Sequence, residues 1–399
     1  MLECWKILEN KKRYKMTERF LTVGSLLRNE ALLKYKREIE KRDDITYPFY
    51  DDFAGYKECE DKAVADVVER QIEAGLPEVT DGEYSKSLWH LDFVWGLKGV
   101  ERYIKENGYF FEDKDCCGKY ETRRDIGLRL VGELSGKNHP FIDHFKRLKK
   151  LVNGRAIVKQ CIPSPSHIYG DVLNFNFLQD SYYQTTEDFE KDLIRSYKEF
   201  LEDFKNAGGE IIQFDDCLWE QFADESENAQ FDGNARADKN IALAEKYIAI
   251  NNEVIDYGHD LGLTIYTHNC RGNYASRHFG AGTYDSIADL FLEKQHYDRF
   301  YLEWDDERAG SLNSLKAFEK NKNAEVVLGF LSSKTAGLDD EKRSLELLDE
   351  AAKIIDKDRL YLSHQCGFAS CDNGNELSRD QQWAKIKQGQ EIAEKFWNK

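Results

Sequence analysis

Short apolar runs alternate with longer amphipathic segments along most of the chain. The runs are rich in β-branched and aromatic residues and stop at polar residues or glycine, which is typical of buried strands. The segments between them repeat apolar residues with the spacing of one helix face. We predict eight strands, at residues 20–23, 76–80, 156–161, 210–214, 263–266, 300–302, 326–330 and 360–362. We predict helices at residues 59–74, 187–205, 239–259, 284–293, 311–321, 340–355 and 379–396.

This alternation predicts an α/β fold, and specifically a (β/α)8 TIM barrel. Residues 84–154 are too many for a bare loop, so we expect an insertion of extra helices and a hairpin after the second strand. The aromatic residues of this insertion are predicted to form a local core, with one wall of a site as the alternative. We expect residues 16–399 to form a single barrel domain and residues 1–15 to be an N-terminal extension, because Met16 is as good a start as Met1.

Composition narrows the classes of partner and compartment. A hydrophobic fraction of 41% supplies a sizeable core for a chain of 399 residues. The net charge of −17 argues against nucleic acid or an anionic membrane as a partner, since both favour basic surfaces. No apolar run is long enough to predict a membrane span. Nine cysteines without framework spacing predict reduced thiols in the cytoplasm rather than disulfides.

The fifth predicted strand ends in two metal-binding side chains, His268 and Cys270. Residues two apart on a strand point to the same side, so both can reach one ion. Imidazole and thiolate together suit zinc. A packing histidine beside an inert buried cysteine is an equally common arrangement, so this pair alone does not establish a metal site.

Other predicted strands also end in polar residues. In a barrel the carboxyl ends of the strands carry the chemistry and bring distant residues together. A helix cap would explain Glu83 or Asp215 singly. A surface ion pair with Arg308 would explain Glu303, and Cys366 would serve as a small buried hydrophobe. Their shared position at one rim is harder to explain in this way. The rim residues are Ser25, Glu83, Asp215, His268, Cys270, Glu303 and Cys366.

In the order and spacing of these motifs, the sequence from Phe20 onward resembles the cobalamin-independent methionine synthase family, specifically its zinc-bearing catalytic barrel. The matching motifs are Val23-Gly24-Ser25, Asp81-Gly82-Glu83, Gln213-Phe214-Asp215-Asp216, His268-Asn269-Cys270, Leu302-Glu303 and Gln365-Cys366-Gly367. The loops at residues 268–273, 332–335 and 364–370 are most similar to those of short relatives with a single barrel.

The resemblance implies a zinc-dependent S-methyltransferase that makes methionine from homocysteine and a methyl donor, through a zinc-bound thiolate. It implies that one zinc has four ligands, which are His268, Cys270, Glu303 and Cys366. It also implies that Glu83 and Asp215 act in catalysis by holding the substrate ammonium, with Gly24 and Ser25 at the substrate carboxylate.

The sequence departs from the full-length enzymes of this family in two ways. The loop after the seventh strand reads Leu331-Ser332-Ser333-Lys334 and offers no histidine to protonate a folate leaving group. The second barrel of those enzymes is also missing. Methyltetrahydrofolate is therefore in doubt as the donor, and a methyl-corrinoid protein, free methylcobalamin and a small methylated thiol or sulfonium all stay open.

A closed zinc site is one alternative. His364 and Cys366 repeat the two-apart spacing of His268 and Cys270, and these four side chains would form a structural site without a position for substrate. The barrel would then be a binding or regulatory protein.

Activation of another thiol, such as coenzyme M, is the second alternative. A sulfonate would need a cation, for which Arg28 and Arg271 are candidates. The carboxylates Glu83 and Asp215 instead suit an ammonium group, and so favour homocysteine.

Overall fold

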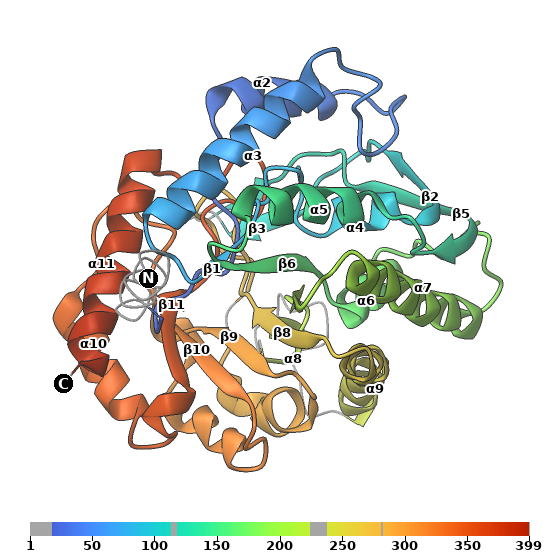
Figure 1. The fold of residues 1–399 in the computed structure, drawn as a ribbon. Coiled ribbons are helices and arrows are strands. Elements are labelled where there is room, and N and C mark those ends of the chain that lie inside the picture. The colour runs from blue at the N-terminus through green and yellow to red at the C-terminus, as the bar shows by residue number, and fades with distance from the viewer. Residues whose placement is uncertain (1–17, 113–117, 224–237, 281, 399) are drawn as a thin grey trace.

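A computed structural model describes residues 18–112, 118–223, 238–280 and 282–398, so the predicted extension at residues 1–15 lies outside the described residues. Seven parallel strands form one curled sheet (Figure 1). Along the sheet they follow in chain order: β1 (Glu78–Val79), β6 (Ile157–Pro163), β7 (Ile211–Asp215), β8 (Thr264–Asn269), β9 (Arg299–Glu303), β10 (Glu325–Leu331) and β11 (Leu360–His364). The prediction of an α/β fold of the TIM-barrel type is confirmed.

The first predicted strand, residues 20–23, forms only a short pairing at the edge of this sheet. The Leu21 amide donates to the carbonyl of Leu362 in β11 at 2.9 Å. A few residues later the Leu26 amide donates to the carbonyl of Gly82, just beyond β1, also at 2.9 Å. The segment therefore links the two edge strands of the sheet, although it is too short and irregular to be a full strand.

Helices cover the outer face of the sheet, and α7 shows why they form. Its residues Phe189, Leu193 and Tyr197 are buried and lie four apart, on one face of the helix. Thr185 caps its first turn by accepting a hydrogen bond from the Asp188 amide at 3.1 Å. The helices of the barrel and its loops are α2 (Glu30–Ile39), α3 (Tyr56–Glu73), α5 (Pro140–Val152), α6 (Pro165–Asn174), α7 (Thr186–Asn206), α8 (Glu220–Ala223), α9 (Asp238–Asp260), α10 (Glu341–Ala351) and α11 (Arg379–Trp397).

Two predicted helices, at residues 284–293 and 311–321, are replaced by tighter or wider turns. The first is a 3₁₀ turn at Tyr284–Ser286 followed by a π turn at Ala288–Leu292, and the second is a 3₁₀ segment at Leu312–Glu319. The Tyr284 hydroxyl accepts a hydrogen bond from the Glu303 amide at 3.0 Å. This contact fixes the start of the first segment at the rim, so tertiary structure overrides the helical period there. Further short 3₁₀ turns are Glu307–Ala309 and Lys357–Arg359.

Residues 84–154 were expected to hold extra helices and a hairpin, and the structure describes two helices and two antiparallel strand pairs there. Besides α5, the described part holds α4 (Leu91–Gly96), β2 (Lys98–Tyr103), β3 (Phe110–Glu112), β4 (Lys119–Glu121) and β5 (Gly127–Ser135). Strand β2 pairs antiparallel with β5, and β3 pairs antiparallel with β4. The division of the chain into one barrel domain and an extension stays a prediction.

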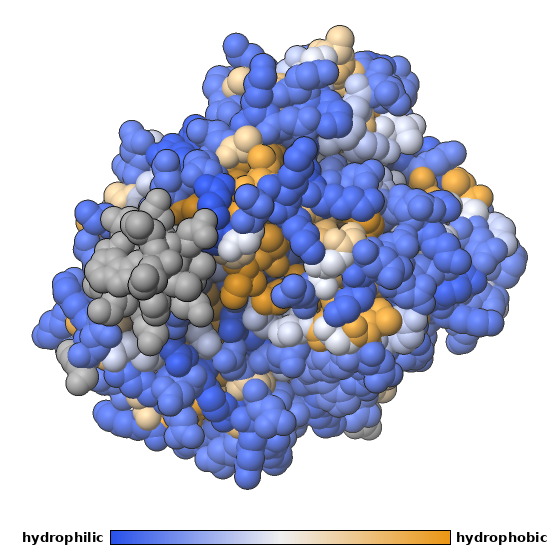
Figure 2. Space-filling model, viewed as in Figure 1, coloured by the Kyte–Doolittle hydropathy of each residue, from blue (hydrophilic) through white to orange (hydrophobic). Residues whose placement is uncertain are grey.

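Figure 2 shows a mostly hydrophilic face on which hydrophobic residues gather toward the middle. Within the described ranges, no helix is long and apolar enough to cross a membrane.

Candidate metal centre and its pocket

Four donor side chains converge at the carboxyl ends of three strands. His268 and Glu303 lie at the ends of β8 and β9, and Cys270 and Cys366 lie just beyond β8 and β11. All four are buried, and their donor atoms lie within 4.8 Å of one another. The Cys270 and Cys366 sulfur atoms are 3.6 Å apart. Zn–S bonds of about 2.3 Å in a tetrahedron would place two sulfur atoms roughly 3.8 Å apart, so the spacing suits a zinc ion.

The hydrogen bonding of this cluster also suits a metal. Among the described residues, the His268 Nε2 atom and both carboxylate oxygens of Glu303 have no hydrogen-bond partner, although all three are buried. Buried polar atoms without partners are costly, and a shared cation would satisfy all of them. The other ring nitrogen of His268, Nδ1, lies 3.3 Å from the Tyr301 carbonyl oxygen. Donation to that carbonyl leaves the Nε2 lone pair directed at the cluster, as second-shell partners do in metal sites.

The electrostatics of the two thiols point the same way. The neighbouring Cys217 raises the pKa of Cys270, and Cys270 with burial raises the pKa of Cys366. Two adjacent thiolates would repel each other in this buried site, so the protein alone favours the thiols. A dication favours the thiolates because metal ligands must be deprotonated.

The structure does not place His364 in this cluster. Its ring lies 5.7 Å from the Phe20 ring and 4.8 Å from the Phe368 ring. Burial lowers the pKa of His364 to about 3, so the imidazole is neutral. Glu303, rather than His364, is the fourth member of the donor group among the described residues.

The two carboxylates predicted to bind an ammonium face the same pocket as the donor cluster. Asp215 ends β7 and accepts a hydrogen bond from Gln213 Nε2 at 2.7 Å. Burial, followed by the nearby charge of Glu83, raises the pKa of Asp215 to about 8. Glu83 already has a cation, because Lys86 Nζ lies 3.1 Å from its Oε1 atom. The sequence analysis missed Lys86, and Asp215 is the carboxylate that has no such partner in the structure as described.

The structure places the two residues predicted to bind the substrate carboxylate, Gly24 and Ser25, in different positions relative to the pocket. Ser25 lines the pocket, whereas Gly24 is not among the lining residues. The Gly24 carbonyl accepts a hydrogen bond from Thr80 Oγ1 at 2.6 Å. A Cβ atom at Gly24 would lie 3.0 Å from Cys161 Sγ, and its φ angle is +146°. Glycine is needed here for close packing behind the pocket, and the contact of Gly24 with the substrate carboxylate stays a prediction.

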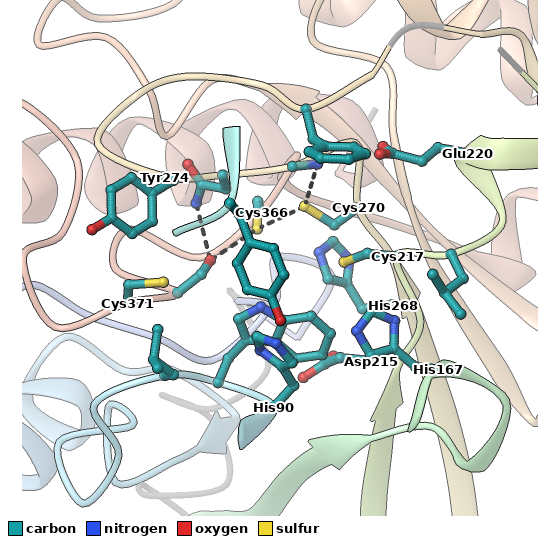
Figure 3. A pocket seen from close by; sticks show the side chains of 18 of the residues that line it. His90, His167, Asp215, Cys217, Glu220, His268, Cys270, Tyr274, Cys366 and Cys371 are labelled. Carbon is teal, nitrogen blue, oxygen red and sulfur yellow. Dashed lines mark hydrogen bonds between the residues drawn. The ribbon is translucent and has the colours of Figure 1, made fainter. Parts of the chain in front are cut away.

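A second cluster in the pocket was missed by the sequence analysis. His90, His167 and Asp171 are buried, and the Asp171 Oδ2 atom lies 3.8 Å from His90 Nε2 and 3.4 Å from His167 Nε2. In the view of Figure 3, the two imidazoles lie below the thiols of Cys270 and Cys366. A signal for part of this cluster exists in the sequence. His167 and Asp171 are four apart on α6, which begins almost directly after β6, so they share one helix face at the rim.

The prediction that the aromatic residues of the insertion form a local core is correct for only part of them. Phe93 and Trp95 are buried in the main hydrophobic core. Trp89, Tyr109 and Phe111 instead line the pocket, in agreement with the alternative that these residues form one wall of a site. The periodicity could not separate the two groups, because both come from one aromatic-rich stretch.

The two arginines considered for a sulfonate are engaged elsewhere. Arg28 donates four hydrogen bonds to backbone carbonyls, those of Glu83, Lys86, Ala369 and Cys371. The Arg271 guanidinium lies over the Tyr284 ring at 4.4 Å. Neither residue is part of the pocket lining, which weakens the case for coenzyme M.

Known proteins resemble this chain over nearly its full length. It is 33% identical over 376 residues to the uncharacterized protein YxjH of Bacillus subtilis, which covers 94% of this chain and 93% of that protein. YxjG of the same organism is 32% identical over 379 residues, with the same coverage. No protein-family model matches the chain.

Solved structures of similar proteins share this architecture. A protein of Listeria monocytogenes, assigned as a vitamin-B12-independent methionine synthase, superposes with a TM-score of 0.65 at 26% identity, covering 95% of this chain and 97% of that one. A B12-independent methionine synthase of a Shewanella species, solved in complex with selenomethionine, also has a TM-score of 0.65. The Shewanella protein is 18% identical, and the match covers 96% of this chain and 98% of that one, so this comparison shows a similar fold alone.

Proposed function

Because this chain belongs to the cobalamin-independent methionine synthase family, we propose that it is a zinc-dependent methyltransferase that methylates the thiol of homocysteine to give methionine. The family supports a methyltransferase-type enzyme in general. The observation that carries the specific proposal is the buried donor cluster, which combines two thiols, one imidazole and one carboxylate within 4.8 Å.

The zinc ligands in this proposal are His268, Cys270, Glu303 and Cys366. Zinc held there supplies a Lewis acid that keeps a coordinated thiol in its nucleophilic, deprotonated form near neutral pH. His268, Cys270 and Cys366 line a pocket, so a substrate sulfur has access to the cluster. A purely structural zinc site would have no need of such a pocket.

The remaining pocket residues are assigned to the amino-acid part of the substrate. The Asp215 carboxylate is positioned to accept hydrogen bonds from an ammonium group, whose charge would offset its burial. Glu83 adds negative charge while Lys86 fixes its position, 3.1 Å away. Ser25 also lines the pocket and offers a hydroxyl group.

The proposal also covers the cellular compartment, the binding partners and the methyl donor. We assign the enzyme to the cytoplasm, with small-molecule substrates and without nucleic acid or membrane partners. Methyltetrahydrofolate, a methyl-corrinoid protein, free methylcobalamin and methylated thiols or sulfoniums are the donor classes to be tested.

The test is a donor screen with zinc-loaded protein and homocysteine, in which methionine is measured by mass spectrometry. We expect methionine with at least one donor class, and none with the metal-free protein or with Cys366→Ser. Coenzyme M in place of homocysteine provides the thiol control, and we expect no methylated product from it. Absence of methionine with every donor would overturn the proposal, and methylated coenzyme M would favour the other thiol.

A further inference from the structure

One wall of the pocket combines a buried carboxylate with several aromatic rings. Trp89 lies against both histidines of the second cluster, with ring centroids 4.7 Å from His90 and 4.7 Å from His167. Tyr109 packs on Phe175, with centroids 5.0 Å apart, and both line the same pocket. Aromatic faces carry partial negative charge, so a wall of this kind attracts cations.

Asp171 lies in this wall without a basic side chain paired to it. Within the described ranges, its contacts with ionisable groups at short range are the two imidazoles, at 3.8 and 3.4 Å. Burial, together with the charge of Asp216, raises the pKa of Asp171 to about 8, and Lys105 opposes this only in part. Lys105 Nζ lies over the rings of Phe175 and Phe177, at 4.9 and 5.2 Å, rather than beside the carboxylate. A cationic ligand would supply the positive charge that is missing beside this carboxylate.

The two imidazoles do not supply it, because they are neutral. Burial lowers the pKa of His90 to about 3, and burial with the neighbouring His90 lowers the pKa of His167 well below its ordinary value. They therefore act as two further uncharged aromatic faces.

The described lining of the pocket supplies carboxyl groups but no cationic side chain. Glu83, Asp171, Asp215 and Glu220 line it, and no lysine or arginine of the described residues does so. Such a lining disfavours anionic donors such as a polyglutamyl folate or the phosphate of a corrinoid.

A second metal ion fits this wall less well than an organic cation. A histidine that binds metal normally donates its other ring N–H to a partner. His268 has such a partner in the Tyr301 carbonyl oxygen. The Nδ1 atoms of His90 and His167 are buried, and neither finds a hydrogen-bond partner in the part of the chain that the structure describes.

We propose that the wall formed by Trp89, Tyr109, His90, His167 and Asp171 binds the methyl donor, and that the donor is a small methylated onium compound, a sulfonium or a quaternary ammonium. This inference rests on the proposed function, since it names the donor for the same reaction. The wall and three members of the donor cluster, His268, Cys270 and Cys366, line one pocket, so the onium methyl group can face the substrate sulfur.

The chemistry of an onium donor balances within this site. The lone pair of the substrate thiolate forms the new S–CH3 bond, while the CH3–S⁺ or CH3–N⁺ bond of the donor breaks. The electron pair of that bond stays on the donor, which leaves as a neutral thioether or amine. No proton has to be delivered to the leaving group. The loop at Ser332-Ser333-Lys334, which has no histidine, is therefore compatible with this donor class.

The binding test uses zinc-loaded protein and calorimetry with four onium probes: S-methylmethionine, dimethylsulfoniopropionate, choline and glycine betaine. The neutral choline isostere 3,3-dimethylbutan-1-ol is the matched probe without charge. We expect at least one onium to bind at least tenfold more tightly than the neutral isostere. Comparison of the two sulfonium probes with the two quaternary ammonium probes shows which kind of cation the wall binds more tightly. Equal binding of the charged and neutral probes would overturn the inference.

Variants locate the binding site. Asp171→Asn should weaken onium binding at least tenfold, and Trp89→Leu at least fivefold, while Trp89→Phe should retain binding within threefold. Phe110→Leu is the matched control, because Phe110 is 46% exposed and is not part of the pocket lining. Unchanged zinc content and a cooperative thermal unfolding transition exclude misfolding as the cause of lost binding. Unchanged affinity in both Asp171→Asn and Trp89→Leu would contradict the assignment.

Two further outcomes separate this inference from the proposed function. Methionine formation from methyltetrahydrofolate or methylcobalamin, but from no onium donor, would overturn the onium assignment and leave the homocysteine methyltransferase standing. A zinc content of two ions per chain that falls to one in Asp171→Asn would also overturn it, because the wall would then be a metal site. Failure of homocysteine to bind would remove the proposed function itself.

Discussion

Glu83 and Lys86 form a buried ion pair, with Lys86 Nζ 3.1 Å from Glu83 Oε1, directly beside the pocket. Lys86 Nζ also donates to the Cys161 carbonyl at 2.8 Å. The nearby charge of Glu83 opposes the effect of burial and raises the pKa of Lys86, so the lysine is charged. This pair makes Glu83 a fixed, partly neutralised group and leaves Asp215 as the freer carboxylate for an incoming ammonium.

Removal of Lys86 should therefore be costly. Lys86→Met leaves the Glu83 carboxylate buried without its cation, and we expect the free energy of unfolding to fall by about 3 kcal/mol or more. The double variant Glu83→Gln/Lys86→Met removes both charges and should be less destabilised than Lys86→Met. Urea unfolding of the zinc-loaded proteins measures both values. If the free energy of unfolding of the double variant falls by the sum of the losses in Glu83→Gln and in Lys86→Met, the result would argue against the ion pair.

Asp215 is predicted to act on the substrate amine. In Asp215→Asn we expect homocysteine binding to weaken by about 1.5–3 kcal/mol, the range of a hydrogen bond to a charged group, with zinc retained. The thiol 4-mercaptobutyrate lacks the amine, so its affinity should not change. Calorimetry with the two thiols measures the difference. Equal losses for both would show that the variant has damaged the pocket rather than the ammonium site.

The metal ligands can be distinguished from other nearby thiols. Cys270→Ser and Cys366→Ser should each abolish retention of zinc through gel filtration with a weak chelator, because each removes one of two thiolate ligands. Cys371→Ser is the matched control, since Cys371 is also buried and lines the pocket but is not in the donor group. Zinc content by mass spectrometry gives the result. Full zinc retention in both Cys270→Ser and Cys366→Ser would contradict the ligand assignment.

The raised pKa of Asp171 leads to the prediction that the stability of the folded protein depends on pH. Its pKa is raised to about 8 in the folded chain, by burial and by Asp216, while Lys105 lowers it slightly and His90 and His167 are neutral. The unfolded chain has the ordinary value near 4, so the folded chain binds an extra proton between about pH 4 and pH 8. The stabilising contribution of protonated Asp171 is complete below pH 4 and is lost as the pH rises toward 8.

Relative to Asp171→Asn, the free energy of unfolding should therefore fall with rising pH, by at most about 1.4 kcal/mol per pH unit over this interval. Urea unfolding of both proteins at several pH values, without any onium, tests this. A constant difference between the two proteins across the interval would contradict the raised pKa.

The sequence predicted the fold and the donor cluster because both depend on local patterns repeated along the chain. Strand ends are visible as apolar runs that stop at polar residues, and a barrel brings such ends together. The strand-end pattern placed His268, Cys270, Glu303 and Cys366 at the rim, and the family resemblance singled out these four as ligands. The structure places their donor atoms within 4.8 Å.

The residues that were missed depend on contacts that no local pattern encodes. Lys86 lies only three residues after Glu83, but its pairing with that carboxylate depends on the turn beyond β1. Trp89 and His90 come from the insertion and meet His167 of α6 only in the folded chain. The exchange of two predicted helices for 3₁₀ and π turns also follows from tertiary contacts, such as that between Tyr284 and Glu303.

The most direct test of the central claim is zinc K-edge X-ray absorption of the purified protein, with and without homocysteine. We predict one zinc bound by two sulfur atoms and two lighter ligands, which gains a third sulfur atom when homocysteine is added. A first shell that stays unchanged with homocysteine, or a zinc without the two cysteine sulfur atoms, would contradict the account.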